Sequence, residues 1–177
     1  MGGRIGIRPI PCSQVIFDDR QIGDYSDKFD NWICFCSQKQ LIELLTKASS
    51  GKKRWMLLSW IKSNPIPLCC NIYLPDTEYI VHSFVKNRLF GGYNEKSRYI
   101  IHPCRQNKPH PNQKPEAVIE KLVKLGSQEG ELVMDLFAGS GTTGIVCKRL
   151  GRKCILVEKE EKYCEVAAKL LSEDLGI

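Results

Sequence analysis

The hydrophobic positions of the first half of the chain form short apolar runs separated by polar and proline-containing segments. Runs of this length, bounded by turn residues, predict strands. The helical spacing of Leu41, Leu44, Leu45 and Ala48 predicts a helix over residues 38–48. The segments that the pattern predicts as strands in this half are 15–19, 31–37, 54–62 and 77–85.

The pattern is clearest in the last third, where helices and strands alternate. Pro115 occupies the position that proline prefers at a helix start, and Gly126 ends the same helix. A strand, a glycine-rich turn, a helix and a second strand then indicate a right-handed βαβ unit of a mostly parallel sheet. We therefore expect a single α/β domain over residues 1–177. The predicted elements are helix 115–126, strand 131–138, helix 142–151, strand 153–158 and helix 159–171.

Composition adds that this is an ordinary globular chain, because 42% of residues are hydrophobic and 26% are charged. No apolar run approaches the ~20 residues of a membrane span, and no signal peptide follows Met1. We expect a cytoplasmic protein whose nine cysteines are reduced thiols. No C-x-x-C pair occurs, so small buried hydrophobic residues are favoured for Cys34 and Cys36. Zinc is the weaker alternative, and no metal is expected.

The formal excess charge of +6 lies entirely between Lys86 and Lys114, where seven basic residues accompany a single acid, Glu95. Aromatic residues are interleaved with these charges. A solvated face is the ordinary explanation of such a run, and the alternative is a loop-rich basic insert over 86–109 that contacts a polyanion. The residues that could contact such a polyanion are Lys86, Arg88, Lys96, Arg98, Arg105 and Lys108.

Gly139, Gly141 and Gly144 form a G-x-G-x-x-G pattern, which usually suggests a dinucleotide. Here Asp135 stands at the strand end, four residues before the first glycine, where its charge would repel a pyrophosphate. The same charge suits the ammonium and sulfonium of S-adenosylmethionine, and Glu158 at the end of the next strand suits ribose hydroxyls. The pattern therefore favours S-adenosylmethionine over NAD, although an NAD-dependent oxidoreductase stays an alternative.

Each of these residues also has an explanation without a ligand. Asp135 can cap the turn that follows it, and Glu158 can begin a helix, where an acid is favoured. His82 and His102 are expected to be ordinary packed or surface residues. The three tryptophans, Trp32, Trp55 and Trp60, are expected in the core.

Three segments resemble consecutive motifs of the amino-methylating DNA methyltransferases, which act on adenine N6 or cytosine N4. They are HPNQKP (110–115), DLFAGSGTTG (135–144) and VEKEEKYCEVA (157–167), and WIKSNPIP (60–67) is similar to an upstream motif. The resemblance covers about residues 29–172 and implies a Rossmann-like sheet with helices on both faces, S-adenosylmethionine as cofactor and double-stranded DNA as partner. It implies a cofactor-binding part over 110–172, with the pocket residues His110, Gln113, Lys114, Pro115, Asp135, Phe137, Ala138, Gly139, Ser140, Gly141, Thr142, Thr143 and Glu158.

One expected motif is missing. The family's catalytic tetrapeptide, a polar residue followed by two prolines and an aromatic, does not occur in this sequence. We therefore expect a truncated or degenerate enzyme whose sheet lacks N-terminal strands and whose catalytic residues are unassigned. The alternative is a non-catalytic cofactor-binding or DNA-binding subunit that needs another chain or self-association. Asp18, Asp19 and Asn64 are the polar residues nearest to the expected place.

Overall fold

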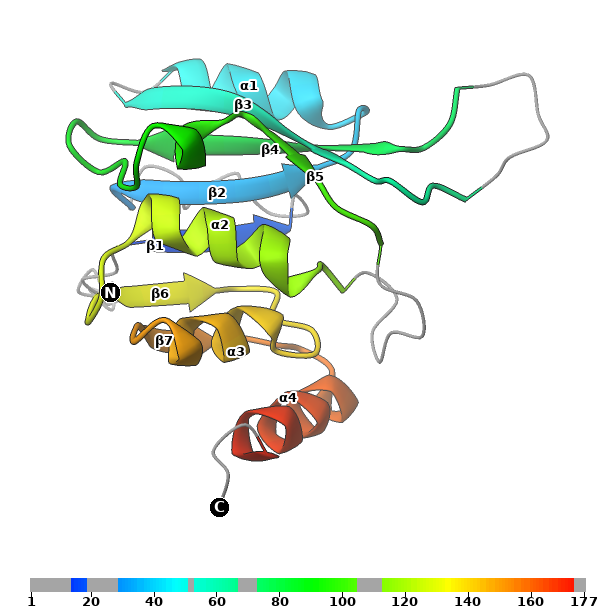
Figure 1. The fold of residues 1–177 in the computed structure, drawn as a ribbon, viewed down its shortest axis with the longest axis vertical. Coiled ribbons are helices and arrows are strands. Elements are labelled where there is room, and N and C mark those ends of the chain that lie inside the picture. The colour runs from blue at the N-terminus through cyan, green and yellow to red at the C-terminus, as the bar shows by residue number, and fades with distance from the viewer. Residues whose placement is uncertain (1–13, 19–28, 51–52, 67–72, 105–112, 174–177) are drawn as a thin grey trace, which may run out of the picture.

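Seven strands form one sheet in the computed structural model, which describes residues 14–18, 29–50, 53–66, 73–104 and 113–173 (Figure 1). The order across the sheet is β5-β3-β4-β2-β1-β6-β7. β4 is antiparallel to both of its neighbours, and every other pair is parallel, which confirms the predicted mostly parallel α/β sheet. The strands are β1 (Gln14–Asp18), β2 (Asn31–Cys36), β3 (Arg54–Ile61), β4 (Thr77–Phe84), β5 (Tyr99–Ile101), β6 (Leu132–Asp135) and β7 (Lys153–Leu156).

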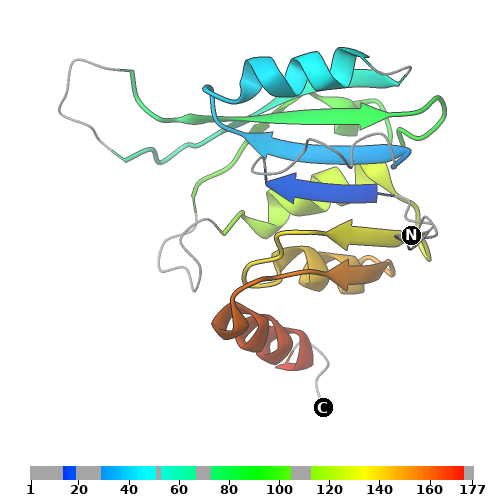
Figure 2. The ribbon, with the colours of Figure 1, turned by 180° about the vertical axis from the view of Figure 1, so that it is seen from behind.

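Four α-helices flank this sheet, as the apolar stripes of the sequence predict. α2 and α3 cover one face, and α1 lies on the other, as the front and back views show (Figures 1 and 2). α4 packs against α3 at the β7 end of the sheet. The helices are α1 (Leu41–Ser50), α2 (Glu116–Gly126), α3 (Thr142–Arg149) and α4 (Glu161–Glu173). None of the described helices is long and apolar enough to span a membrane.

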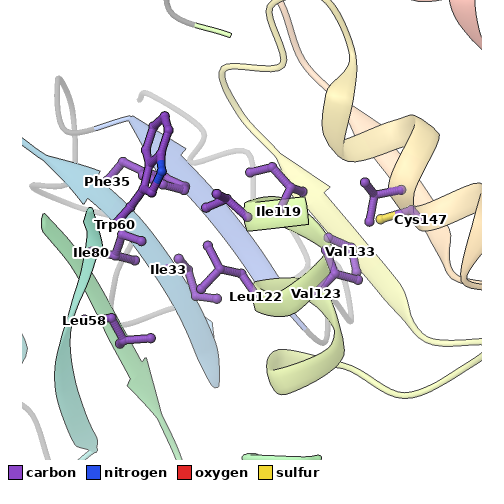
Figure 3. Packing of buried hydrophobic residues seen from close by; sticks show 12 residues of the cluster. Ile33, Phe35, Leu58, Trp60, Ile80, Ile119, Leu122, Val123, Val133 and Cys147 are labelled. Atoms are coloured by element: carbon purple, nitrogen blue, oxygen red, sulfur yellow. The ribbon is translucent and has the colours of Figure 1, made fainter. Parts of the chain in front are cut away.

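The two faces of the central strands bury two separate hydrophobic clusters. Ile33 and Phe35 of β2 point to the face under α2, whereas Trp32, Cys34 and Cys36 point to the face under α1. This alternation follows from the two-residue period of a strand, and a fully buried strand must be apolar on both sides. The larger cluster joins β2, β3, β4 and β6 to α2 and α3 (Figure 3). Both cysteines are buried, as expected.

The strand order reverses between β1 and β6, and the region outside the carboxyl ends of these two strands is named the cofactor crevice. β6 leads through α3 to β7 on one side, and the next strand after β1 in the chain, β2, lies on the other side. Parallel α/β sheets bind ligands outside the carboxyl ends of their strands at such a reversal of strand order. The fold therefore directs attention to the ends of β6, β1 and β2.

The described part of the basic segment contains, besides loops, the one-turn 3-10 helix η3 (Asn94–Lys96) and the edge strand β5. Each has three residues, which are too few for a helical or strand period of hydrophobic positions to be visible in the sequence. The expectation of three core tryptophans is wrong for Trp55, which is 37% exposed on β3, whereas Trp32 and Trp60 are buried. The expected self-association stays a prediction.

Candidate cofactor-binding site

Asp135 ends β6 and organises the loop that follows it. Its Oδ1 accepts a hydrogen bond from the backbone N–H of Phe137 at 3.0 Å, and its Oδ2 accepts one from Thr143 Oγ1 at 2.5 Å. The side chain thus joins the end of β6 to the first turn of α3 and is buried. Asp135 therefore caps the turn after β6, which is the explanation without a ligand that the sequence offers. Because each carboxylate oxygen has a second lone pair, capping leaves room for a ligand.

The glycines of the loop are required by backbone shape and packing. Gly139 and Gly141 have φ values of 53° and 81°, a region that strains other residues. A Cβ on Gly141 would lie 2.8 Å from Ala167 Cβ of α4, and one on Gly144 would lie 2.7 Å from Leu156 Cδ1 of β7. The second and third glycines of the pattern therefore let α3 approach α4 and β7 closely.

Glu158 follows β7 and is bound to the same loop. Its Oε2 accepts the backbone N–H of Gly139 at 2.8 Å, and its Oε1 accepts those of Lys159 and Glu160, each at 2.9 Å. The contacts with Lys159 and Glu160 are the helix-start role that the sequence allowed for Glu158. Asp135 thus holds Phe137 and Thr143 on either side of the glycine-rich turn, and Glu158 holds Gly139 between them.

Two buried polar atoms beside this loop lack hydrogen-bond partners within the described part of the chain. They are Gln113 Oε1 and Ser140 Oγ, on residues that are 6% and 2% exposed. Gln113 Nε2 donates to Thr142 Oγ1 at 3.2 Å, which places this side chain at the start of α3. Because a buried polar atom without a partner costs about 1–3 kcal/mol, such atoms suit a polar ligand. The donors and acceptors here fit the amino acid end of S-adenosylmethionine.

Gln113 and Lys114 were predicted together, but the partners of their side chains lie on different elements. Gln113 contacts α3 beside β6, whereas Lys114 Nζ is 2.5 Å from Glu78 Oε2 of β4. Pro115 caps α2 and is buried. Phe137, Ala138, Thr142 and Thr143 lie in the loop or the first turn of α3. His110 is outside the described residues.

The candidate DNA-binding residues do not gather at this site. β4 runs opposite to its neighbours, so Lys86 and Arg88, which follow it, lie near the amino ends of β2 and β3. Lys96 lies in η3, and Arg98 precedes β5 and lies beside Ser59 in the carboxyl half of β3. Arg88 binds Glu131 with two hydrogen bonds of 2.8 and 3.0 Å and lies over the Phe90 ring. Arg105 and Lys108 are outside the described residues.

Sequence reasoning missed the charged group at the carboxyl ends of β2 and β3. Glu78 joins Lys62 and Lys114, and no local motif marks it, because its partners lie far away in the chain. Asn64 has a structural role, since it donates to Cys104 O at 3.1 Å and accepts from Cys104 N at 2.6 Å. No group of three potential metal ligands occurs among the described residues.

Comparison with known proteins agrees with this geometry. The chain is 33% identical over 136 residues to the type II methyltransferase M2.LlaDCHI of Lactococcus lactis subsp. cremoris, and 32% identical over 135 residues to M2.DpnII of Streptococcus pneumoniae. Each match covers 66% of this chain and 50% of the relative. The chain therefore spans about half the length of these curated relatives.

Solved structures share the fold. A complex of M1.HpyAVI with S-adenosylmethionine superposes with a TM-score of 0.78 at 27% identity, covering 92% of this chain and 90% of that one. The cytosine-N4-specific PvuII DNA methyltransferase gives a TM-score of 0.69 at 15% identity, covering 93% of this chain and 84% of that one, which is a likeness of fold alone. The model of the N6/N4 DNA methylase family matches residues 21–169. This chain therefore belongs to the amino-methylating (N6/N4) DNA methylase family.

Proposed function

We propose that this chain binds S-adenosylmethionine and serves methyl transfer to the exocyclic amino group of adenine (N6) or cytosine (N4) in double-stranded DNA. The observation that carries the proposal is the pair of buried, unpartnered polar atoms of Gln113 and Ser140, beside the Asp135 loop at the reversal of strand order. Family membership supports the same reaction class. The protein is therefore proposed to act in the cellular compartment that contains the DNA.

The residues divide the cofactor between them. Asp135 and the Gln113 and Ser140 side chains are proposed to hold the amino acid end, and Glu158 is proposed to accept hydrogen bonds from the ribose hydroxyls. Gly139 lets the backbone approach the ligand without a Cβ in the way. When bound, S-adenosylmethionine supplies an electrophilic methyl group on a positively charged sulfur. The protein contributes position and a water-excluding crevice.

DNA binding is the second part of the proposal. We propose that the duplex binds at the carboxyl ends of the parallel strands, where the target base can leave the stack and reach the cofactor crevice. Lys86 follows β4 near the amino ends of β2 and β3, and Lys96 and Arg98 lie on the segment that leads into β5, which four strands separate from β6. These three residues are proposed to attract the duplex through their electrostatic field, and Arg105 and Lys108, outside the described residues, stay candidates for DNA contact. Arg88 serves the scaffold through Glu131.

The cofactor proposal predicts weaker binding when either acid is lost. We expect Asp135→Ala and Glu158→Ala each to weaken S-adenosylmethionine binding by about 10- to 100-fold, because stranding a polar or charged partner costs roughly 1–3 kcal/mol. Isothermal calorimetry with the full chain measures this change. Glu161→Ala removes an exposed acid from the first turn of the adjacent helix and serves as the matched control.

The same titration separates the rival functions. NAD is expected not to compete, because Asp135 would repel its pyrophosphate. Binding of NAD without binding of S-adenosylmethionine would favour an oxidoreductase. Thermal melting of each variant accompanies the titration, since Asp135 also holds Thr143 and Phe137 in place.

A further inference from the structure

Lys62, Glu78 and Lys114 form a charged group at the carboxyl ends of β2 and β3, outside the cofactor crevice. We name this group the positive cluster. Glu78 lies near the start of β4, and its two oxygens contact Lys62 Nζ at 3.0 Å and Lys114 Nζ at 2.5 Å. Lys114 Nζ lies 5.0 Å from the centre of the Phe35 ring and 5.9 Å from that of Trp60, and Lys62 Nζ lies 5.4 Å from the Trp60 ring. Figure 3 shows these two rings side by side at one end of the hydrophobic cluster.

The cluster carries a net charge of +1, because one carboxylate balances only one of two ammonium groups. Burial pushes the pKa of Glu78 upward, but the two lysines outweigh it, so the pKa lies below its usual value and Glu78 stays ionised. The lysine side chains are 17% and 25% exposed. Each ammonium has three donors, and among the described residues Glu78 is their one acidic partner. The Phe35 and Trp60 rings attract the two ammonium groups and favour a cation at the carboxyl ends of β2 and β3.

Strand register places this cluster on the far side of β1 from the cofactor crevice. Phe35 of β2 pairs with Asp18 at the end of β1, and Asp135 of β6 pairs with Ile16 of the same strand. Because neighbouring strands are about 4.8 Å apart, β2 and β6 lie about 10 Å from each other. The cofactor residues therefore lie on the β6 side of the carboxyl end of β1, and Lys114 Nζ, over the Phe35 ring, lies on its β2 side. Glu78 on β4 and Lys62 after β3 lie one and two strands further away.

We propose that Lys62 and Lys114 bind backbone phosphates of the DNA strand that carries the target base. This inference rests on the proposed function, because it assumes that the base enters between the two groups. The positive cluster supplies ammonium donors to a phosphodiester, and Glu78 holds both lysines in position. Lys114 thus belongs to the acceptor side of the site, although its motif neighbour Gln113 faces the cofactor.

The salt dependence of DNA binding tests this proposal. Each lysine–phosphate contact steepens the fall of log affinity against log salt by about 0.9. We expect Lys62→Gln and Lys114→Gln each to flatten that slope by about this amount, measured by fluorescence anisotropy on a labelled mixed-sequence 30-base-pair duplex with the full chain. Lys124→Gln is the matched control, since Lys124 is also ion-paired, 2.6 Å from Glu120, but lies near the end of α2.

Parallel calorimetry keeps the result interpretable. We expect both variants to bind S-adenosylmethionine within about twofold of the parent, and Lys114→Arg, which keeps the charge, to keep the parent slope. An unchanged slope in both glutamine variants would overturn the proposal, as would a tenfold loss of S-adenosylmethionine affinity in Lys114→Gln with an unchanged slope. Failure of the parent to bind S-adenosylmethionine would instead contradict the proposed function.

Discussion

The purified 177-residue chain is expected to methylate duplex DNA at least about 100-fold more slowly than a relative that carries the complete catalytic motif. The exocyclic amine is a poor nucleophile while its lone pair is conjugated with the ring, so a group that accepts its hydrogen bonds must position it. Misplacement by about 1 Å alone costs about 100-fold. The sequence contains no polar-Pro-Pro-aromatic tetrapeptide to do this. Transfer of a labelled methyl group from S-adenosylmethionine to mixed-sequence duplex DNA measures the rate.

Fast turnover would contradict this expectation and would direct attention to the end of β1. Asp18 is the last residue of β1 and lies in register with Phe35, between the cofactor crevice and the positive cluster. Asp18→Ala should then abolish turnover and leave S-adenosylmethionine binding intact. Asn64, a candidate from sequence alone, is a poor second choice, because its amide is bound to the backbone of Cys104.

The second large effect concerns His82, which is 1% exposed at the centre of a polar network under α2. Its Nε2 lies 2.7 Å from Asn31 Oδ1, and Asn31 Nδ2 donates to the carbonyl oxygens of Arg88 and Gly126 at 3.1 and 2.8 Å. Because the Asn31 amide donates in both of those bonds, its oxygen accepts from His82 Nε2. This network joins β2 and β4 to the end of α2.

Burial of His82 predicts that the protein loses stability in mild acid. Removal from water lowers the pKa of His82 from 6.5 to about 4. Above pH 6.5 the side chain is neutral whether or not the chain is folded. Below that pH the unfolded chain binds a proton that the folded chain resists until about pH 4. Because one pKa unit corresponds to about 1.36 kcal/mol, we expect a loss of about 3 kcal/mol of unfolding free energy across this range.

Urea denaturation between pH 7.5 and 4 measures this loss. His82→Gln has no titrating group at this position, so the difference between parent and variant isolates the histidine from the carboxylates that titrate nearby in pH. His102→Gln replaces a histidine outside the network and controls for the substitution itself. Parallel pH profiles of parent and His82→Gln would show that His82 does not control acid stability.

The sequence by itself determined the elements of the last third and the class of ligand. Proline at a helix start, glycine at its end and the strand–turn–helix pattern act over a few residues, so the ranges around Pro115 and Gly126 agree with α2. The motif around Asp135 is equally local, and the fold of that loop follows from Gly139 and Gly141. Family resemblance then needed only these short segments.

Only the tertiary structure decided which charges share a surface. A strand has the same apolar pattern in either direction, so the sequence could not show that β4 runs opposite to β2 and β3. That reversal carries Lys86 and Arg88 to the amino ends of β2 and β3 and brings Glu78 to their carboxyl ends. The sequence could not show either that the side chains of Gln113 and Lys114 lie apart, because each is held by a partner distant in sequence. Gln113 is held by Thr142 and Lys114 by Glu78. Pairing between strands, a non-local interaction, therefore decides where a positive charge can meet DNA.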